Sequence, residues 1–211
     1  LDLDENTSSI ISDRAFSNDK SKVTKFASKY IDGMHEAGMK STAKHFPGHG
    51  GVHEDSHIDL PVDDRSLEEL LQNDIEPYLK LKGKIDAVMC AHVLFSSIDK
   101  NIPSYSKFWI QKIIRNKLDF DCIVFSDDLS MYGAGEESYY TKTLKSLNAG
   151  CDMVLICNKR NHLKEVLDNL EKSSIKLSDK LANMKKYRDV SWNDLNQDKR
   201  ALNIREWLSK I

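Results

Sequence analysis

The sequence predicts an α/β fold built on a parallel sheet, and three observations support this class. Apolar runs alternate with amphipathic helical segments once the first dozen residues are passed. The predicted strands are nearly continuous apolar runs, as expected for strands that helices cover on both faces. The 211 residues are 40% hydrophobic and 30% charged, which suits one folded domain. A doubly wound sheet and a (β/α) barrel both fit this pattern.

The first part of the chain predicts a helix, a strand and a long loop. Residues 21–39 carry apolar side chains at the spacing of an amphipathic helix, and Gly38 is the expected stop signal. Residues 41–46 are predicted to form a short strand. Residues 47–65 show no period, and a loop of this length is uncommon in a compact domain unless it is a lid or a binding loop.

The middle of the chain predicts two helices that flank a strand. Ser66 is a suitable N-cap for a helix over residues 66–81, although Pro77 should kink or end that helix. Residues 85–91 form an apolar strand, and after a loop a further helix covers residues 106–118.

The last part continues the alternation and ends in a charged tail with a helical pattern. Strands are predicted over residues 122–125 and 151–157, and helices over residues 136–149 and 163–170, with Gly150 as a stop signal. A closed eight-stranded barrel usually takes about 250 residues, so the local pattern alone makes this chain short for a barrel.

Composition excludes several classes of function. Lys and Arg number 31 against 33 Asp and Glu, a balance that argues against a nucleic-acid partner. No apolar run approaches the roughly 18 residues of a membrane span, and the polar first residues do not resemble a signal peptide. The four cysteines lie in or beside apolar runs and are expected to be buried and reduced, which favours the cytosol: Cys90, Cys122, Cys151 and Cys157.

The segment from Lys44 to His57 holds four of the seven histidines and three of the nine glycines. Histidines spaced by four would align on a helix, but Pro47 and the glycines oppose a helix here. A barrel metallohydrolase could still gather metal ligands from strand ends, and the candidates for such a set are His45, His92 and Asp127.

A proton-transfer pair is the second interpretation of this segment. In an extended chain, Asp55 and His57 project to the same side, so Asp55 could fix the tautomer of the ring and favour its protonated form. Such a histidine can give a proton to a leaving group and later take one from water. The alternative is that both residues are solvated loop residues.

Ionisable residues also end three of the predicted strands. Asp127 and Asp128 follow the apolar strand before them, at the carboxyl end where α/β proteins place ligands. One of the two could instead cap the next helix. Lys44 with His45, and His92, end two other strands and could line the same face.

Several motifs resemble the bacterial β-N-acetylhexosaminidases of glycoside hydrolase family 3, the NagZ type. The motifs occur in the family's order within residues 1–157, and they are SDRAFS, KHFPGHG, D-S-H-x-x-L-P, MCAH and FSDDLSM. The resemblance implies a (β/α)8 TIM barrel of which this chain covers roughly the C-terminal two thirds. Residues 1–211 would then form a single catalytic barrel domain whose first strands and helices are missing from this sequence.

The resemblance also implies roles for individual residues. Asp127 would be the nucleophile of a retaining exo-β-N-acetylglucosaminidase, and His57 with Asp55 the acid/base pair. The sugar in the −1 position would be bound by Arg14, Lys44 and His45, while Asp128 stays structural. The implied substrate is an N-acetylglucosaminyl-anhydromuropeptide of cell-wall recycling in the bacterial cytoplasm, with no metal or organic cofactor.

Three alternatives remain open at this level. Some members of the family with a histidine acid/base transfer the sugar to phosphate, which a histidine repels less than a carboxylate would. The other two are a metal-dependent TIM-barrel hydrolase that uses the histidine cluster and a non-catalytic sugar-binding module.

Overall fold

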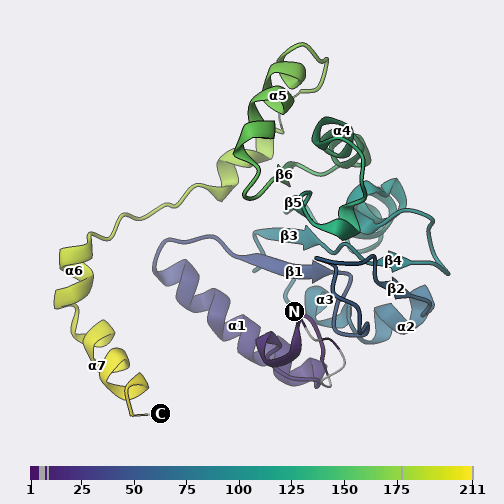
Figure 1. Cartoon of the computed structure of the whole chain (residues 1–211). Helices are drawn as coiled ribbons and strands as arrows, with labels where there is room; N and C mark the ends of the chain where they lie inside the picture. The colour runs from purple at the N-terminus through teal and green to yellow at the C-terminus, as the bar shows by residue number, and fades with distance from the viewer. Residues whose placement is uncertain (5–7, 9, 177, 211) are drawn as a thin grey trace.

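The computed structural model describes residues 1–4, 8, 10–176 and 178–210, and a parallel sheet lies at its centre (Figure 1). Four strands form this sheet in the order β1-β3-β5-β6. Their bounds are Thr42–Phe46 for β1, Ala87–Cys90 for β3, Ile123–Asp128 for β5 and Met153–Leu155 for β6. Because every pair is parallel, the carboxyl ends of the strands meet at one edge.

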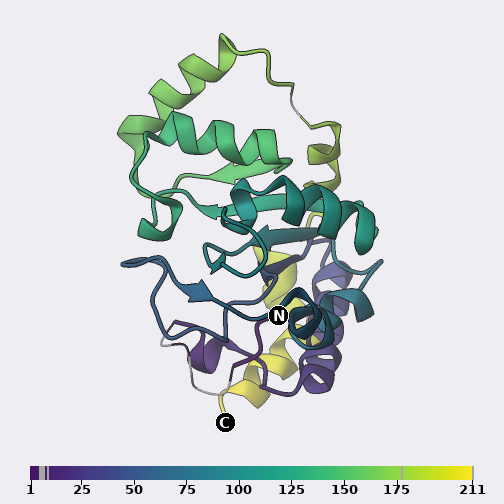
Figure 2. The same cartoon turned by 90° about the vertical axis from the view of Figure 1, so that its right-hand side faces the viewer.

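Helices connect the strands, as a (β/α) fold requires: the π-helix η3 (Phe108–Lys117) lies between β3 and β5, and α4 (Tyr139–Ala149) lies between β5 and β6. The helix α1 (Lys20–Glu36) precedes β1, and α5 (Arg160–Glu171) follows β6. In Figures 1 and 2, α4 and α5 lie at the β6 end of the sheet, whereas α1 lies at the β1 end. The main core forms between strands and helices, where Phe46 packs edge-on against Tyr78 and Trp109. A second, smaller cluster around Phe125 covers the other face of the sheet.

The predicted helix over residues 66–81 is two helices, α2 (Leu67–Gln72) and α3 (Glu76–Lys80). Ser66 caps α2 as predicted, and Glu69 completes a capping box. Pro77 lies in the first turn of α3, where its missing N–H costs no helical hydrogen bond. The proline therefore lies at the start of a second helix, whereas one helix was predicted over residues 66–81.

Two predicted loops contain short elements. Residues 47–65 end with β2 (Val62–Asp63), which pairs in parallel with β4 (Leu94–Phe95) from the loop over residues 92–105. The same second loop contains the 3-10 turn η2 (Pro103–Tyr105). Strands of two residues are too short to show a periodic pattern, so the sequence could not reveal them.

Strand β5 is longer than predicted and includes both acids, Asp127 and Asp128, at its end. Neither acid is the N-cap of a following helix, because the N-cap of the 3-10 helix η4 (Tyr132–Ala134) is Met131 and that of α4 is Ser138. Gly150 ends α4 with φ +117, as expected for a glycine stop signal.

The cysteine prediction holds for Cys90 and Cys151, which are buried, and partly for the half-buried Cys122. It is wrong for Cys157, which is exposed because it lies beyond the end of β6.

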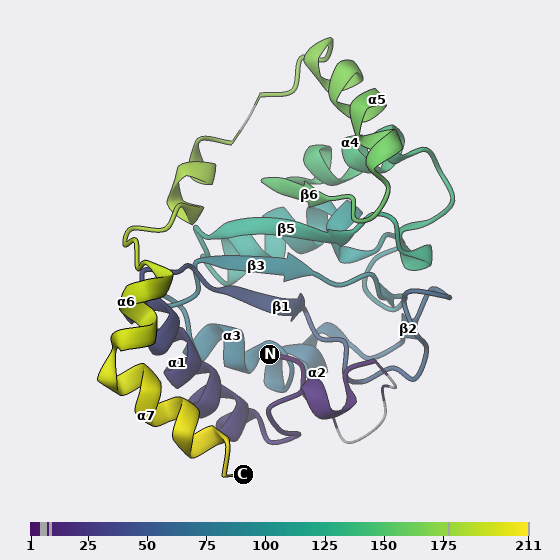
Figure 3. The same cartoon turned by 60° about the vertical axis from the view of Figure 1, so that its left-hand side comes forward.

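The C-terminal segment lies beside α1 (Figure 3). After the 3-10 helix η5 (Asp179–Met184), the chain forms α6 (Trp192–Gln197) and α7 (Lys199–Leu208). Arg200 of α7 forms an ion pair with Glu36 of α1 at 2.7 Å. Among the described helices, none combines the length and apolar character that crossing a membrane demands.

Candidate active site

A polar cavity of about 190 Å³ lies at the carboxyl ends of the strands. It brings together five of the six predicted site residues, and the sixth, Asp55, is bonded directly to one of them. The residues that line it come from four segments of the chain: Ile10, Arg14, Lys44, His45, His49, Ser56, His57, Asp127, Asp128 and Met131.

Asp127 lines the cavity, and one of its two carboxylate oxygens is hydrogen-bonded to the backbone. Its Oδ1 accepts a hydrogen bond from the backbone N–H of Asp128 at 2.8 Å. Its Oδ2 lies 3.9 Å from Nε2 of His45, and the side chain is 15% exposed. The two oxygens are therefore not equivalent, and Oδ2 is the one that can meet a ligand.

Both carboxylate oxygens of the neighbouring Asp128 accept hydrogen bonds from other residues of the protein. Its Oδ1 accepts from the backbone N–H groups of Ser130 and Cys157, both at 2.9 Å, and its Oδ2 accepts from the Ser130 hydroxyl at 2.6 Å. Burial alone raises the pKa of Asp128, but these hydrogen bonds outweigh it and lower the pKa. Asp128 thus ties the end of β5 to the segment after β6, in agreement with a structural role.

Asp55 and His57 form the predicted pair, although the chain there is a turn and not extended. Asp55 Oδ1 accepts from the His57 backbone N–H at 2.7 Å and lies 2.8 Å from Nδ1 of the ring. The prediction of an extended segment is wrong because an aspartate can bond to the backbone two residues on and so build a tight turn.

This contact fixes the tautomer of His57. Burial raises the pKa of Asp55, but the hydrogen bonds from the His57 backbone and ring outweigh it and lower the pKa. An ionised carboxylate can only accept, so Nδ1 of His57 carries the hydrogen and Nε2 is left for proton transfer. The His57 side chain is 55% exposed and stands at the mouth of the cavity.

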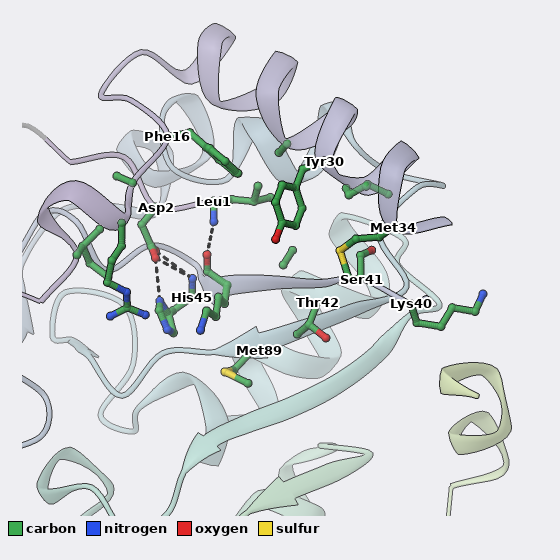
Figure 4. Close-up of a pocket in the computed structure, with 17 residues that line it drawn as sticks. Leu1, Asp2, Phe16, Tyr30, Met34, Lys40, Ser41, Thr42, His45 and Met89 are labelled. Atoms are coloured by element: carbon green, nitrogen blue, oxygen red, sulfur yellow. Dashed lines mark hydrogen bonds and ion pairs between the residues drawn. The ribbon is translucent and has the colours of Figure 1, made fainter. Parts of the chain in front are cut away.

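His45 is held by Asp2, on the side of its ring that faces away from Asp127, and no sequence pattern predicts this contact. Asp2 accepts from the His45 backbone N–H at 3.0 Å and pairs with Nδ1 of its ring at 2.8 Å, as Figure 4 shows. Burial raises the pKa of Asp2, yet the charge and hydrogen bonds of His45 outweigh it and hold this pKa well below its usual range. The pairing directs Nε2 of His45 toward Asp127. No local pattern marks Asp2, because its partner is 43 residues away.

Arg14 and Lys44 are exposed cations that line the polar cavity. They also line a larger cavity of about 480 Å³ along β1, whose walls are mostly apolar (Figure 4). We assign the chemistry to the smaller cavity because Asp127 and His57 line it and do not line the larger one.

The structure does not assemble the alternative metal set. His92 is fully buried beyond the end of β3, and its two ring nitrogens have no hydrogen-bond partner among the described residues. Burial lowers its pKa to about 4. Over the described parts of the chain, no three His, Cys, Asp or Glu side chains are grouped in a way that could hold a metal ion.

This fold and cavity define an α/β protein with a parallel sheet and with carboxylates and histidines at the carboxyl ends of its strands, where (β/α) enzymes carry their active sites. Residues 1–186 match the glycosyl hydrolase family 3 N-terminal domain, and the chain belongs to this family. The predicted resemblance and barrel class are confirmed.

Similar proteins agree with this assignment. A beta-hexosaminidase of Haemophilus influenzae is 45% identical over 198 residues, which are 90% of this chain and 56% of that protein. Native NagZ of Neisseria gonorrhoeae matches 99% of this chain and 61% of its own with a TM-score of 0.88 and 32% identity. Structures of the same NagZ in complex with N-trifluoroacetyl-D-glucosamine and with a zinc ion match with TM-scores of 0.87 and 0.83. The chain therefore spans less than two thirds of the length of these relatives.

Proposed function

We propose that the full-length protein is a retaining exo-β-N-acetylglucosaminidase that needs no cofactor. Its natural substrate would be an N-acetylglucosaminyl-anhydromuropeptide in cell-wall recycling in the bacterial cytoplasm, with residues 1–211 belonging to one catalytic barrel domain. The names of the relatives support the sugar and the reaction class. The observation that carries the proposal is the placement of Asp127 in a cavity shared with His57, with its Oδ1 hydrogen-bonded to the backbone and its Oδ2 3.9 Å from Nε2 of His45.

In the first step, Oδ2 of Asp127 attacks the anomeric carbon. The bond to the leaving oxygen breaks while the protonated His57 gives its Nε2 proton to that oxygen. The product of this step is a glycosyl ester on Asp127. Asp55 stabilises the imidazolium before transfer, because the carboxylate accepts from Nδ1.

In the second step, the neutral His57 takes a proton from a water molecule, which attacks the anomeric carbon and releases Asp127. Two displacements at one carbon give net retention of configuration. Arg14, Lys44 and His45 donate hydrogen bonds to the sugar hydroxyls, and Asp2 positions His45 for that contact.

Replacing the proposed nucleophile tests the function directly. Asp127→Asn should lower the rate of sugar release from an aryl β-N-acetylglucosaminide by at least about 10³-fold, because a neutral amide cannot form the ester. Asp64→Asn, at an exposed position outside the cavity, is the matched control. Near-native activity of the Asp127 variant would exclude it as nucleophile.

The acceptor is tested in the same assay. Arg14, Lys44 and the neutral His57 around the cavity would repel phosphate less than a carboxylate base would. The products should therefore be compared with and without phosphate. We expect free sugar; sugar-1-phosphate as main product would make the protein a phosphorylase. Loss of activity with a chelator and its recovery with zinc would favour the metal-dependent alternative.

A further inference from the structure

In the loop that carries His57, residues 53–59, Ser56 is buried and Asp55 is half-buried, whereas the other side chains are exposed. His53, Glu54 and His57 are exposed, and Ile58 is 75% exposed. Ser56, between them, is only 2% exposed and lines the floor of the polar cavity. Ser56 is therefore the point at which this loop enters the protein interior.

Two hydrogen bonds from different parts of the chain hold Ser56. Its hydroxyl lies 3.0 Å from Nε2 of the buried His49. Its carbonyl oxygen accepts from the backbone N–H of Gly133, also at 3.0 Å, in the short 3-10 helix η4 (Tyr132–Ala134) after β5. The loop after β1 is thereby tied to the loop after β5.

Gly133 leaves no room for movement of Ser56 toward it. A Cβ atom at Gly133 would lie 3.1 Å from the carbonyl oxygens of both Ser56 and His92. Both neighbours are backbone atoms, so a side chain at this position would push the loop outward.

The contact between Ser56 and His49 is linked through Asp2 to His45, on the proposed sugar-binding side of the cavity. The backbone N–H of His49 donates to Asp2 at 2.9 Å, and the same carboxylate holds the ring of His45. His45 in turn faces Asp127. Contacts of 3.9 Å or less thus connect Ser56, in the His57 loop, with His45, which faces the proposed nucleophile Asp127.

We propose that Ser56 is a positioning residue that latches the His57 loop over the cavity, through its hydroxyl to His49 and its carbonyl to Gly133. The latch sets where Nε2 of His57 stands relative to the leaving oxygen. This inference rests on the proposed function for its kinetic consequence, but the latch itself is a property of the loop.

The test compares Ser56→Ala, Gly133→Ala and the control His53→Ala in the full-length protein. His53 is an exposed residue of the same loop that does not line the cavity. Hydrogen exchange of residues 53–59 should become about tenfold faster in both latch variants, since a lost hydrogen bond of ordinary strength changes an opening equilibrium by about this factor. The control should exchange like the native protein.

Kinetics show whether the latch serves proton delivery. In Ser56→Ala, kcat should fall about tenfold for an alkyl glycoside, whose leaving group needs a proton, and less than about twofold for an activated aryl glycoside, with KM unchanged for both. Unchanged exchange in Ser56→Ala would overturn the proposal, and so would equal losses on the two substrates. If the native protein released no sugar, the proposed function would be wrong. The hydrogen-exchange comparison would still show whether Ser56 holds the His57 loop.

Discussion

Asp127 and Asp128 are adjacent carboxylates whose different roles follow from their contacts, of which some are local and others join distant segments. The FSDDLSM motif placed both at a strand end, but the backbone N–H of Cys157 and the hydroxyl of Ser130 occupy Asp128. The pairing of Asp55 with His57 could be predicted because it is local. The contact of Asp2 with His45 could not, and neither could that of Ser56 with Gly133, because only the folded chain brings these partners together.

The burial of His92 predicts how the stability of the protein depends on pH. Burial holds its pKa at about 4, whereas an unfolded histidine titrates near 6.5. Between these values the unfolded state binds more protons, so the folded state loses stability as pH falls from about 6.5 to about 4. His92→Phe removes this loss together with the two ring nitrogens, which have no hydrogen-bond partner in the described part of the chain.

Urea unfolding at two pH values measures the effect. The stability of His92→Phe relative to the native protein should rise by about 2 kcal/mol between about pH 7.5 and about pH 5. A difference that does not change with pH would show that the ring is not held neutral by burial.

At the scale of elements, the strands of the main sheet and the helix caps were predictable, whereas the division of one helix into two and the two-residue strands were not. The amphipathic spacing of α1 and the stop at Gly150 follow from local chemistry, and both agree with the structure. The division into α2 and α3 depends on how Pro77 fits a first turn, and the pairing of β2 with β4 depends on tertiary contacts. Periodicity carries no information on either.

Asp86 makes a prediction about how β1, β3 and α1 are joined. Its carboxylate accepts from the backbone and hydroxyl of Ser41 and pairs with His35 at 2.7 Å and Lys40 at 3.0 Å. Burial raises the pKa of Asp86, but these contacts outweigh it and lower the pKa to about 2. The stabilisation is present above about pH 4 and is lost as pH falls toward about 2.

Asp86→Asn should therefore lower the free energy of unfolding by about 1.5–3 kcal/mol at neutral pH, and the difference should shrink toward about pH 2. Asp121→Asn, at a side chain that is 93% exposed, is the control and should change it by less than about 0.5 kcal/mol. A pH-independent difference for Asp86→Asn would contradict the assigned charge state.

At the scale of the whole molecule, the barrel class was indicated by motifs and not by the strand count. Four parallel strands fit a doubly wound sheet equally well, so the pattern of elements could not decide. The motifs could, because they resemble those of a family whose fold is a (β/α)8 barrel. The relatives, of which this chain spans less than two thirds, then agreed on the family.

Two ion pairs that join distant parts of the molecule should differ in strength. Arg115 donates to Asp152 at 2.8 Å and to two backbone carbonyls, and the two side chains are 16% and 10% exposed. Arg200 and Glu36 are 72% and 62% exposed. Arg115→Ala should lower the free energy of unfolding by about 3–5 kcal/mol, and Arg200→Ala by less than about 1 kcal/mol. Equal effects in urea unfolding would contradict this order.

Covalent trapping tests the nucleophile most directly. A fluorinated N-acetylglucosaminide with a good leaving group should form a stable glycosyl ester on the full-length protein, because the second displacement is slowed more than the first. Intact mass and peptide mapping should place one sugar on Asp127 and none in Asp127→Asn. An adduct on Asp128, or turnover that inverts the anomeric configuration without an adduct, would contradict the account.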